Sequence, residues 1–287
     1  MLKYEHVNVA VSRTNILNDI NITFPKGQIT TIIGPNGCGK TTLLQCLNGC
    51  SKVTAGTITV DNENILSLPL KERAKRIALL PQIRTVIPVL PVRTLVEHGR
   101  FPYLGFTRRK TDKDNEIVNN SMEFTNVMPY SEDNADTLSG GIRQRVFFSM
   151  ILAQDSRIII MDEPVTYLDL EGKRTFFSMV NKLKKSGKTI ILVLHDLSDA
   201  IRISDNLVIM NDRKIAISDT PANCLKTHII EDVFHTTYKK FSDDELWYTG
   251  IGSNTIRSLP DSMNSWQVQK WYIDKNGSIY KDNYINV

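Results

Sequence analysis

The sequence has 287 residues, of which 41% are hydrophobic and 23% are charged. This is ordinary globular composition, and the length allows one large or two small domains with a sizeable core. The formal net charge is +4, and the Lys and Arg residues are spread along the chain. Such a dispersed, mildly basic charge gives little support to nucleic-acid binding, so no nucleic-acid partner is expected.

The cysteines and the apolar runs indicate the cellular compartment of the protein. Four cysteines, none of them in a C-x-x-C pair, indicate reduced thiols. No apolar run approaches the roughly 18 residues that a membrane-spanning helix needs. Residues 1–15 contain polar side chains throughout and lack the apolar centre of a signal peptide. We therefore expect a cytosolic protein whose role at a membrane comes through a partner.

Short strands dominate the first part of the chain. Alternating apolar residues predict antiparallel strands at 2–11 and at 16–24, the second with Ile16, Ile20 and Ile22 on one face. A helix is predicted to begin near residue 42, and three further strands are predicted at 29–33, 56–61 and 77–80.

The region from about 84 to 155 changes character, because helical spacing replaces the strand-like runs. We interpret it as a helical insertion between two halves of an α/β core. Strand character returns at 157–161 and 189–194, where short runs that are apolar on both faces indicate parallel strands buried between helix layers. The residues 207–217 read as a hairpin. The tail, 242–287, is rich in polar and aromatic residues and predicts a small appended hairpin element.

A complete phosphate-binding motif, G-x-x-x-x-G-K-[ST], runs from Gly34 to Thr41, between a predicted strand and a predicted helix. The glycines let main-chain N–H groups and a helix N-terminus face a phosphate. Lys40 would reach the β- and γ-phosphates, and the Thr41 hydroxyl would hold Mg²⁺. The alternative is a glycine-rich turn before an ordinary helix, but the context favours an ATP and Mg²⁺ site. The candidate residues are Gly34, Pro35, Asn36, Gly37, Cys38, Gly39, Lys40, Thr41 and Thr42.

Two carboxylates end the predicted strand that precedes Pro164. A buried strand that ends in Asp162 and Glu163 would bring both to the mouth of the sheet, beside the phosphate loop. Asp162 would bind in the Mg²⁺ shell, and Glu163 would orient and deprotonate an attacking water. The alternative is a pair of acidic residues that merely begins a loop, and the phosphate loop upstream favours the functional interpretation.

The stretch Leu138-Ser139-Gly140-Gly141-Ile142 allows two interpretations. It can be an N-capped amphipathic helix, with Ser139 as the cap. It can also be a second helix N-terminus whose exposed N–H groups meet a γ-phosphate.

With these motifs in this order, the sequence resembles the ATPase subunit of ATP-binding cassette (ABC) transporters over about residues 1–241. The resemblance rests on the phosphate loop, the Leu-Ser-Gly-Gly stretch and the Asp-Glu-Pro strand end, together with Gln82, Tyr167-Leu168-Asp169 and His195. It implies an α/β phosphate-loop NTPase core with a mostly parallel sheet and an antiparallel N-terminal β part. The helical insertion of about 84–155 and the extension at 242–287 complete the predicted organisation.

The resemblance also implies roles for individual residues. Two cassettes would pair head to tail, so that Ser139, Gly140 and Gly141 touch ATP bound to the partner. Gln82 would contact Mg²⁺ or water, His195 the γ-phosphate, and Asp169 would lie at the dimer seam. Two positions depart from the family pattern. Ile142 replaces the usual Gln, and Val11 stands where an aromatic residue often stacks on adenine.

A narrower resemblance is to the ATPases of iron–siderophore, haem and cobalamin importers, with residues 98–103 as its most telling stretch. It implies an ATP-hydrolysing subunit on the cytoplasmic face of the cell membrane. Its expected partners are a second cassette, an integral membrane permease and, through that permease, an external substrate-binding protein. The alternatives are a soluble cassette ATPase that switches a nucleic acid, ribosome or cytosolic partner, and, less favoured, an exporter ATPase.

Overall fold

The computed structural model describes residues 1–11, 14–82, 88–105, 109–235, 237–242, 245–249, 271–273 and 279–281. The chain forms two compact units, Met1–Cys224 and Leu225–Val287. None of the described helices is both long enough and apolar enough to cross a bilayer.

The N-terminal part is a four-stranded antiparallel sheet in the order β2-β1-β4-β5. Its strands are β1 (Leu2–Val11), β2 (Thr14–Phe24), β4 (Val53–Val60) and β5 (Glu63–Asn64). This confirms the predicted antiparallel start of the chain. One detail differs, because β2 buries Leu17 and leaves Ile16 partly exposed. A bulge at Asp19, whose φ is 48°, shifts the alternation by one residue between Leu17 and Ile20.

The first unit is built on a six-stranded sheet in the order β10-β9-β3-β8-β7-β6. Five strands run parallel, and β10 pairs antiparallel with β9 at the edge, as the predicted hairpin requires. Every residue of β3, β7 and β8 is buried, which fits their continuous apolar runs. The strands are β3 (Ile29–Ile33), β6 (Ile77–Leu80), β7 (Ile158–Asp162), β8 (Thr189–Val193), β9 (Asn206–Asn211) and β10 (Lys214–Asp219).

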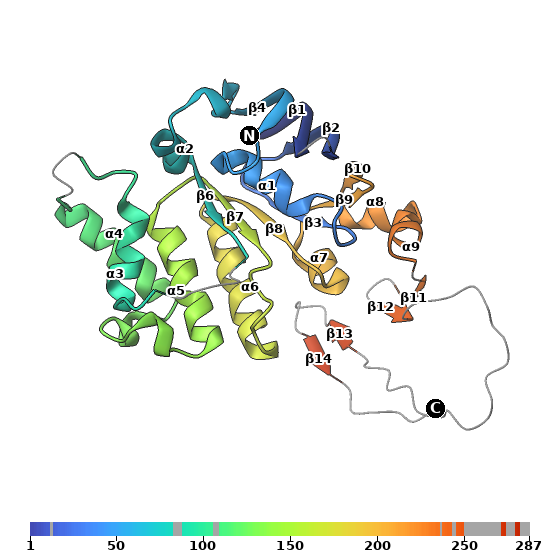
Figure 1. The fold of residues 1–287 in the computed structure, drawn as a ribbon. Coiled ribbons are helices and arrows are strands. Elements are labelled where there is room, and N and C mark those ends of the chain that lie inside the picture. The colour runs from blue at the N-terminus through green and yellow to red at the C-terminus, as the bar shows by residue number, and fades with distance from the viewer. Residues whose placement is uncertain are drawn as a thin grey trace. The chain divides into compact units, whose positions relative to one another are not determined.

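Helices cover this sheet and fill the segment between β6 and β7 (Figure 1). That segment holds α3, α4 and α5, which share a small core of their own around Val96, Met122 and Val146. The helices of the first unit are α1 (Lys40–Asn48), α2 (Leu70–Arg76), α3 (Val92–Glu97), α4 (Asp112–Phe124), α5 (Gly140–Ala153), α6 (Leu170–Lys185) and α7 (Leu197–Ile203). Short 3₁₀ turns are η1 (Ile65–Ser67), η2 (His98–Arg100), η3 (Met128–Tyr130) and η4 (Ala135–Thr137).

Two-stranded hairpins characterise the C-terminal unit. After α8 (Pro221–Lys226), in which the first unit ends, come α9 (Ile229–Phe234) and a hairpin of β11 (Thr237–Ser242) with β12 (Glu245–Thr249). A second antiparallel pair joins β13 (Trp271–Ile273) to β14 (Ile279–Lys281). The Asn-Gly turn predicted for this hairpin lies outside the described residues. The domain boundary at 241 and 242 remains a prediction.

Candidate functional site

The phosphate loop connects β3 to α1, and two of its glycines are required by close packing. A Cβ at Gly34 would lie 2.3 Å from the Met210 carbonyl oxygen. Gly39, with φ of 105°, caps α1, and a Cβ there would lie 2.7 Å from a methyl of Leu17. The loop therefore passes close to the surrounding chain at both ends. Its backbone N–H groups and the start of α1 form the type of cradle that phosphates occupy.

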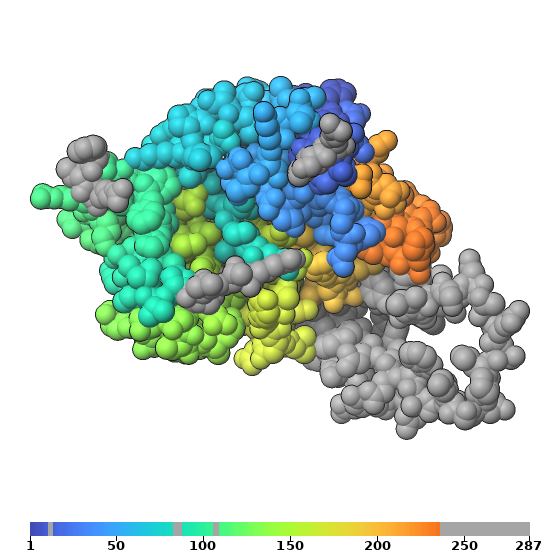
Figure 2. Space-filling view, viewed as in Figure 1, coloured from blue at the N-terminus to red at the C-terminus, as the bar shows by residue number. Residues whose placement is uncertain are grey.

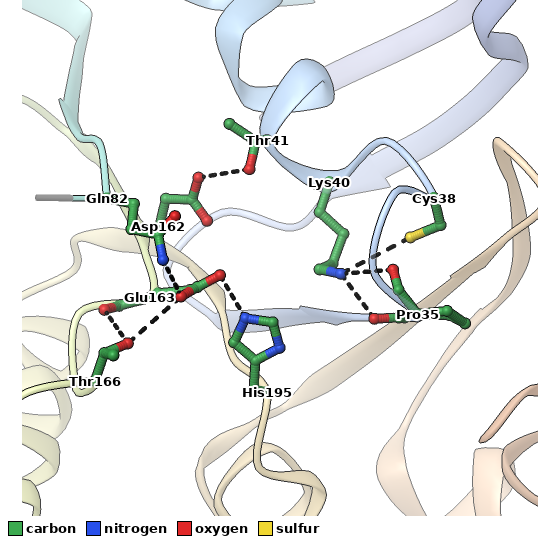
Figure 3. A network of polar contacts seen from close by, with 10 residues as sticks. Pro35, Cys38, Lys40, Thr41, Gln82, Asp162, Glu163, Thr166 and His195 are labelled. Atoms are coloured by element: carbon green, nitrogen blue, oxygen red, sulfur yellow. Dashed lines mark hydrogen bonds and ion pairs between the residues drawn. The ribbon is translucent and has the colours of Figure 1, made fainter. Parts of the chain in front are cut away.

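Lys40 is held inside this loop. Its side chain is buried, and its Nζ donates to the carbonyl oxygens of Gly34, at 2.7 Å, and Pro35, at 2.9 Å. Figure 3 shows the ammonium group within the turn of the loop. A charged donor held by neutral carbonyls can exchange them for phosphate oxygens, which are stronger acceptors.

The hydroxyl of Thr41, in the first turn of α1, donates a 2.9 Å hydrogen bond to Oδ2 of Asp162, the last residue of β7. The other oxygen, Oδ1, is buried and has no hydrogen-bond partner among the described residues. Burial raises the pKa of Asp162, and the hydrogen bond from Thr41 partly opposes this effect. Mg²⁺ prefers oxygen ligands, and here the Thr41 hydroxyl lies beside a carboxylate that has one oxygen without a hydrogen-bond partner among the described residues. The residues present therefore fit this metal ion.

The carboxylate of Glu163 is the centre of a second polar cluster. Oε2 accepts a hydrogen bond from the side-chain amide of Gln82, and Oε1 contacts Nε2 of His195 (Figure 3). The hydroxyl of Thr166 lies 3.5 Å from Oε2. The Glu163 side chain is mostly buried, whereas about half of the His195 side chain is exposed. A carboxylate placed in this way can accept a proton from water.

The sheet explains why these residues meet. Asp162 ends β7, His195 follows β8 after Leu194, and the phosphate loop follows β3. These three strands are neighbours and run parallel, so their carboxyl ends open on one edge. Glu163 turns away from the strand direction with φ of 54°, while its N–H donates to the Val193 carbonyl. Its side chain is thereby directed to the edge beside Asp162.

The stretch Ser139-Gly140-Gly141 lies elsewhere in the chain, at the N-terminus of α5. Ser139 caps this helix, with its hydroxyl 3.5 Å from the Ile142 N–H. The stretch borders a cavity of about 400 Å³ between α5 and the start of α6, whose wall includes Tyr167 and Asp169. In Figure 2 the green surface of this region adjoins the yellow surface of α6. Asp169 caps α6 through the Gly172 N–H, at 2.7 Å.

The predicted site residues thus fall into two groups. The first group combines the phosphate loop, Gln82, Asp162, Glu163 and His195, in which Gln82 bonds to Glu163 and Thr41 bonds to Asp162. Among the described residues, Ser139 forms no hydrogen bond to this first group. One chain therefore carries two separate groups of predicted site residues.

Two side chains of β1 bear on the adenine position. Tyr4 is buried and donates to the Leu43 carbonyl, so it serves the core rather than a nucleotide base. The side chain of Val11 lies outside the described part of the structure. Sequence reasoning missed Thr166, although its position two residues after Pro164 at the strand end was a usable signal.

The stretch 98–103 is held by a buried ion pair. The Arg100 side chain donates to Asp114 Oδ1 and to the Ala153 carbonyl, both at 2.8 Å, and its guanidinium lies 4.0 Å from the ring centroid of Tyr103. Burial opposes ionisation of Asp114, but hydrogen bonds from Thr111 and Arg100 hold its pKa below the usual range. Arg100 therefore links this stretch to α4 and to the end of α5.

Known proteins resemble this chain over most of its length. The family model for ABC transporters matches residues 17–166. The chain is 38% identical to the petrobactin import ATP-binding protein FpuD of Bacillus anthracis, over 87% of this chain and 92% of that protein. The chain belongs to the ABC transporter family. This ABC cassette is also 34% identical to the ferric enterobactin transport ATP-binding protein FepC of Escherichia coli (strain K12), over 92% of this chain and 97% of FepC.

The fold of this ABC cassette matches solved relatives. A dimeric structure of MJ0796, a bacterial ABC transporter cassette, superposes with a TM-score of 0.69 at 25% identity, covering 77% of this chain and 99% of that one. The predicted fold class, a phosphate-loop NTPase core, is thereby confirmed. As a member of this family, the protein is an ATPase that binds and hydrolyses ATP.

Proposed function

We propose that this ABC cassette is the energising subunit of an importer for an iron–siderophore or a related metal chelate. The observation that carries the proposal is the extent of its similarity to FpuD and FepC, proteins named for petrobactin import and ferric enterobactin transport. The cassette would work on the cytoplasmic face of the cell membrane, bound to an integral permease that receives cargo from an external binding protein.

The chain's own residues account for ATP binding and hydrolysis in this proposal. Lys40 would exchange its two loop carbonyls for phosphate oxygens. Thr41 and Asp162 would hold Mg²⁺, which when bound neutralises charge on the phosphates. Glu163 would accept a proton from the attacking water, after that water replaces one of the contacts that Gln82 and His195 make to the carboxylate.

The division of the predicted site residues into two groups, with Ser139 in the second, supports a head-to-tail dimer. Each phosphate loop would face the Ser139-Gly140-Gly141 stretch of a second copy, whose helix N-terminus presents N–H groups to the γ-phosphate. Asp169 would lie at the seam between the two copies. ATP binding would close the dimer, and this closure would move the permease docked on the segment between β6 and β7.

A mixing experiment tests the composite site. The variants Lys40→Ala and Ser139→Glu are each expected to be inactive as homodimers. In a mixed dimer, the intact phosphate loop of the Ser139→Glu copy faces the intact Ser139 of the Lys40→Ala copy, so one complete site forms and ATPase activity returns. If each chain instead built its site alone, mixing would restore nothing. Wild-type protein mixed with Lys40→Ala gives the reference for dilution.

Transport is tested in cells of the source organism. Deletion of the gene should abolish uptake of radiolabelled iron from at least one ferric siderophore, and the wild-type gene, but not the Glu163→Gln variant, should restore it. Tagged Glu163→Gln protein should also recover a polytopic permease from detergent-solubilised membranes with ATP and Mg²⁺. Normal uptake from every ferric chelate, with recovery of soluble partners alone, would contradict the proposal.

A further inference from the structure

A second cavity, of about 380 Å³, lies at the amino ends of the parallel strands, away from the carboxyl ends that carry the phosphate loop. Its wall includes Ile158 and Thr189, the first residues of β7 and β8. The end of β4, the last turn of α2 and Tyr103 complete the wall. This volume lies within the usual range for small-molecule sites.

Positive charge predominates in this cavity, which has four basic side chains against two carboxylates. The basic residues are Lys26, Lys75, Arg76 and Arg157, and the acidic residues are Asp61 and Asp155. Both carboxylates already have partners. Asp61 is bonded to the amino group of Met1, and Asp155 lies 2.9 Å from Lys188 Nζ. Neither carboxylate forms an ion pair with any of these four basic side chains.

The four basic residues differ in whether they form ion pairs. Lys75 and Arg76 form ion pairs with Glu72, at 2.7 Å, and with Glu63, at 2.6 Å, and neither glutamate lines the cavity. The side chains of Lys26 and Arg157, by contrast, form no ion pair or hydrogen bond within the part of the chain that the structure describes. Two positive side chains without an ion pair among the described residues therefore border one cavity.

These two charges act on the same carboxylate. The hydrogen bond from the Met1 amino group is the main reason why the pKa of Asp61 is lowered, and the charges of Lys26 and Arg157 add to the effect. Lys26 and Arg157 are 131 positions apart in sequence, yet both lie close enough to Asp61 to lower its pKa. A ligand with two separated anionic groups could engage both of them.

The walls are held in place without a ligand. The Arg100 guanidinium lies 4.0 Å from the centroid of the Tyr103 ring. Thr189 Oγ1 accepts a 2.9 Å hydrogen bond from the Gly27 N–H, directly after Lys26. The Ser156 hydroxyl donates to the Ala74 carbonyl, also at 2.9 Å, and so ties the end of α2 to the start of β7. A pre-formed wall lowers the entropic cost of binding.

We propose that this cavity binds a small organic or inorganic anion with at least two phosphate or carboxylate groups. Arg157 supplies a planar guanidinium that suits either group, and Lys26 supplies a second point charge. Tyr103 forms an aromatic wall. The cavity shares no lining residue with the phosphate loop or the Glu163 cluster, so this site is distinct from the ATP site.

Titration calorimetry on the full-length protein tests the proposal, in Mg²⁺-free buffer so that the probes do not chelate the metal ion, and with ADP saturating the phosphate loop so that other sites respond. The probes are citrate and pyrophosphate. At least one probe should bind, and the double variant Lys26→Gln/Arg157→Gln should weaken that binding about 10-fold or more. The control variant Lys52→Gln/Lys113→Gln removes the same charge from exposed positions outside the cavity and should bind as the wild type does.

Binding of citrate alone would identify a carboxylate ligand, and binding of pyrophosphate alone a phosphate ligand. Either result supports the site. Equal weakening in the control variant would show a response to overall charge and would overturn the proposal. So would the absence of heat with both probes in the millimolar range. Both substituted cations are exposed, and unchanged ADP affinity in the double variant checks that it is folded.

Discussion

The Thr41 hydroxyl donates a 2.9 Å hydrogen bond to the carboxylate of Asp162, a residue 121 positions later in the chain. The bond links the first turn of α1 to the end of β7. It forms because β3 and β7 both pair with β8, so the loop after β3 and the last residue of β7 meet at one edge of the sheet. The remaining oxygen of Asp162 is buried without a partner among the described residues, and this oxygen is where the metal ion is expected.

Asp162→Asn tests this arrangement through stability. Because burial raises the pKa of Asp162, the ionised carboxylate is costlier in the folded protein than in the unfolded chain. This group therefore disfavours folding increasingly as the pH rises towards and through its folded pKa. We expect the nucleotide-free variant to have a higher Tm than the wild type at pH 7, and the difference to shrink as the pH is lowered.

The same variant should lose the effect of Mg²⁺. In the wild type, Mg²⁺ should tighten ADP binding, and in Asp162→Asn calorimetry should show the same ADP affinity with and without Mg²⁺. A variant that is less stable than the wild type at every pH would contradict the cost that we assign to the buried charge.

Glu163→Gln should reduce ATP hydrolysis by about 10²- to 10⁴-fold, the usual contribution of a general base. The amide keeps the size of the side chain, so ATP binding should persist and a closed dimer should accumulate. Light scattering after size-exclusion chromatography with ATP and Mg²⁺ measures the dimer, and a phosphate-release assay measures turnover. Glu123→Gln, an exposed substitution on α4, is the matched control. Wild-type turnover by Glu163→Gln would remove Glu163 as the base.

Lys40→Ala should weaken ATP binding about 100-fold, which corresponds to the loss of a strong hydrogen bond to a charged group. The lysine bonds to the carbonyls of Gly34 and Pro35 and to the Cys38 thiol, all within its own loop, so the fold should persist. Calorimetry gives the affinity, and circular dichroism checks the fold. Lys113→Ala provides an exposed lysine for comparison. Unchanged affinity would contradict the assignment of this loop as the phosphate site.

Arg100→Ala should destabilise the protein by about 3–5 kcal/mol, because it leaves the buried Asp114 carboxylate without its charged partner. Urea unfolding of the nucleotide-free chain measures the change. The double variant Arg100→Met/Asp114→Asn removes both charges, keeps an acceptor for the hydrogen bonds from Thr111, and should recover most of the loss. If the double variant is no more stable than Arg100→Ala, packing of the guanidinium, rather than the unpaired charge, accounts for the effect.

Local features of this chain were predictable to different degrees. The phosphate loop was readable because one contiguous strand, turn and helix contain all its parts. The buried strands β7 and β8 were readable from branched apolar runs. By contrast, α2 buries none of its residues, so it has no apolar period to detect. Leu17 is buried where alternation predicted Ile16, because a bulge in β2 shifts the pattern by one residue, and alternation alone does not reveal this bulge.

The sequence by itself determined the type of chemistry, because the order of short motifs identifies an ABC ATPase whose fold was predictable as a class. Only the tertiary structure decided which of those motifs meet. Glu163 contacts Gln82 and His195, which are 81 and 32 positions away, and among the described residues Ser139 caps α5 without a hydrogen bond to any of the three. The cavity beside Lys26 and Arg157 is likewise invisible in the sequence. The physical reason is that strand order and register set these contacts, and both are settled by long-range packing rather than by local patterns.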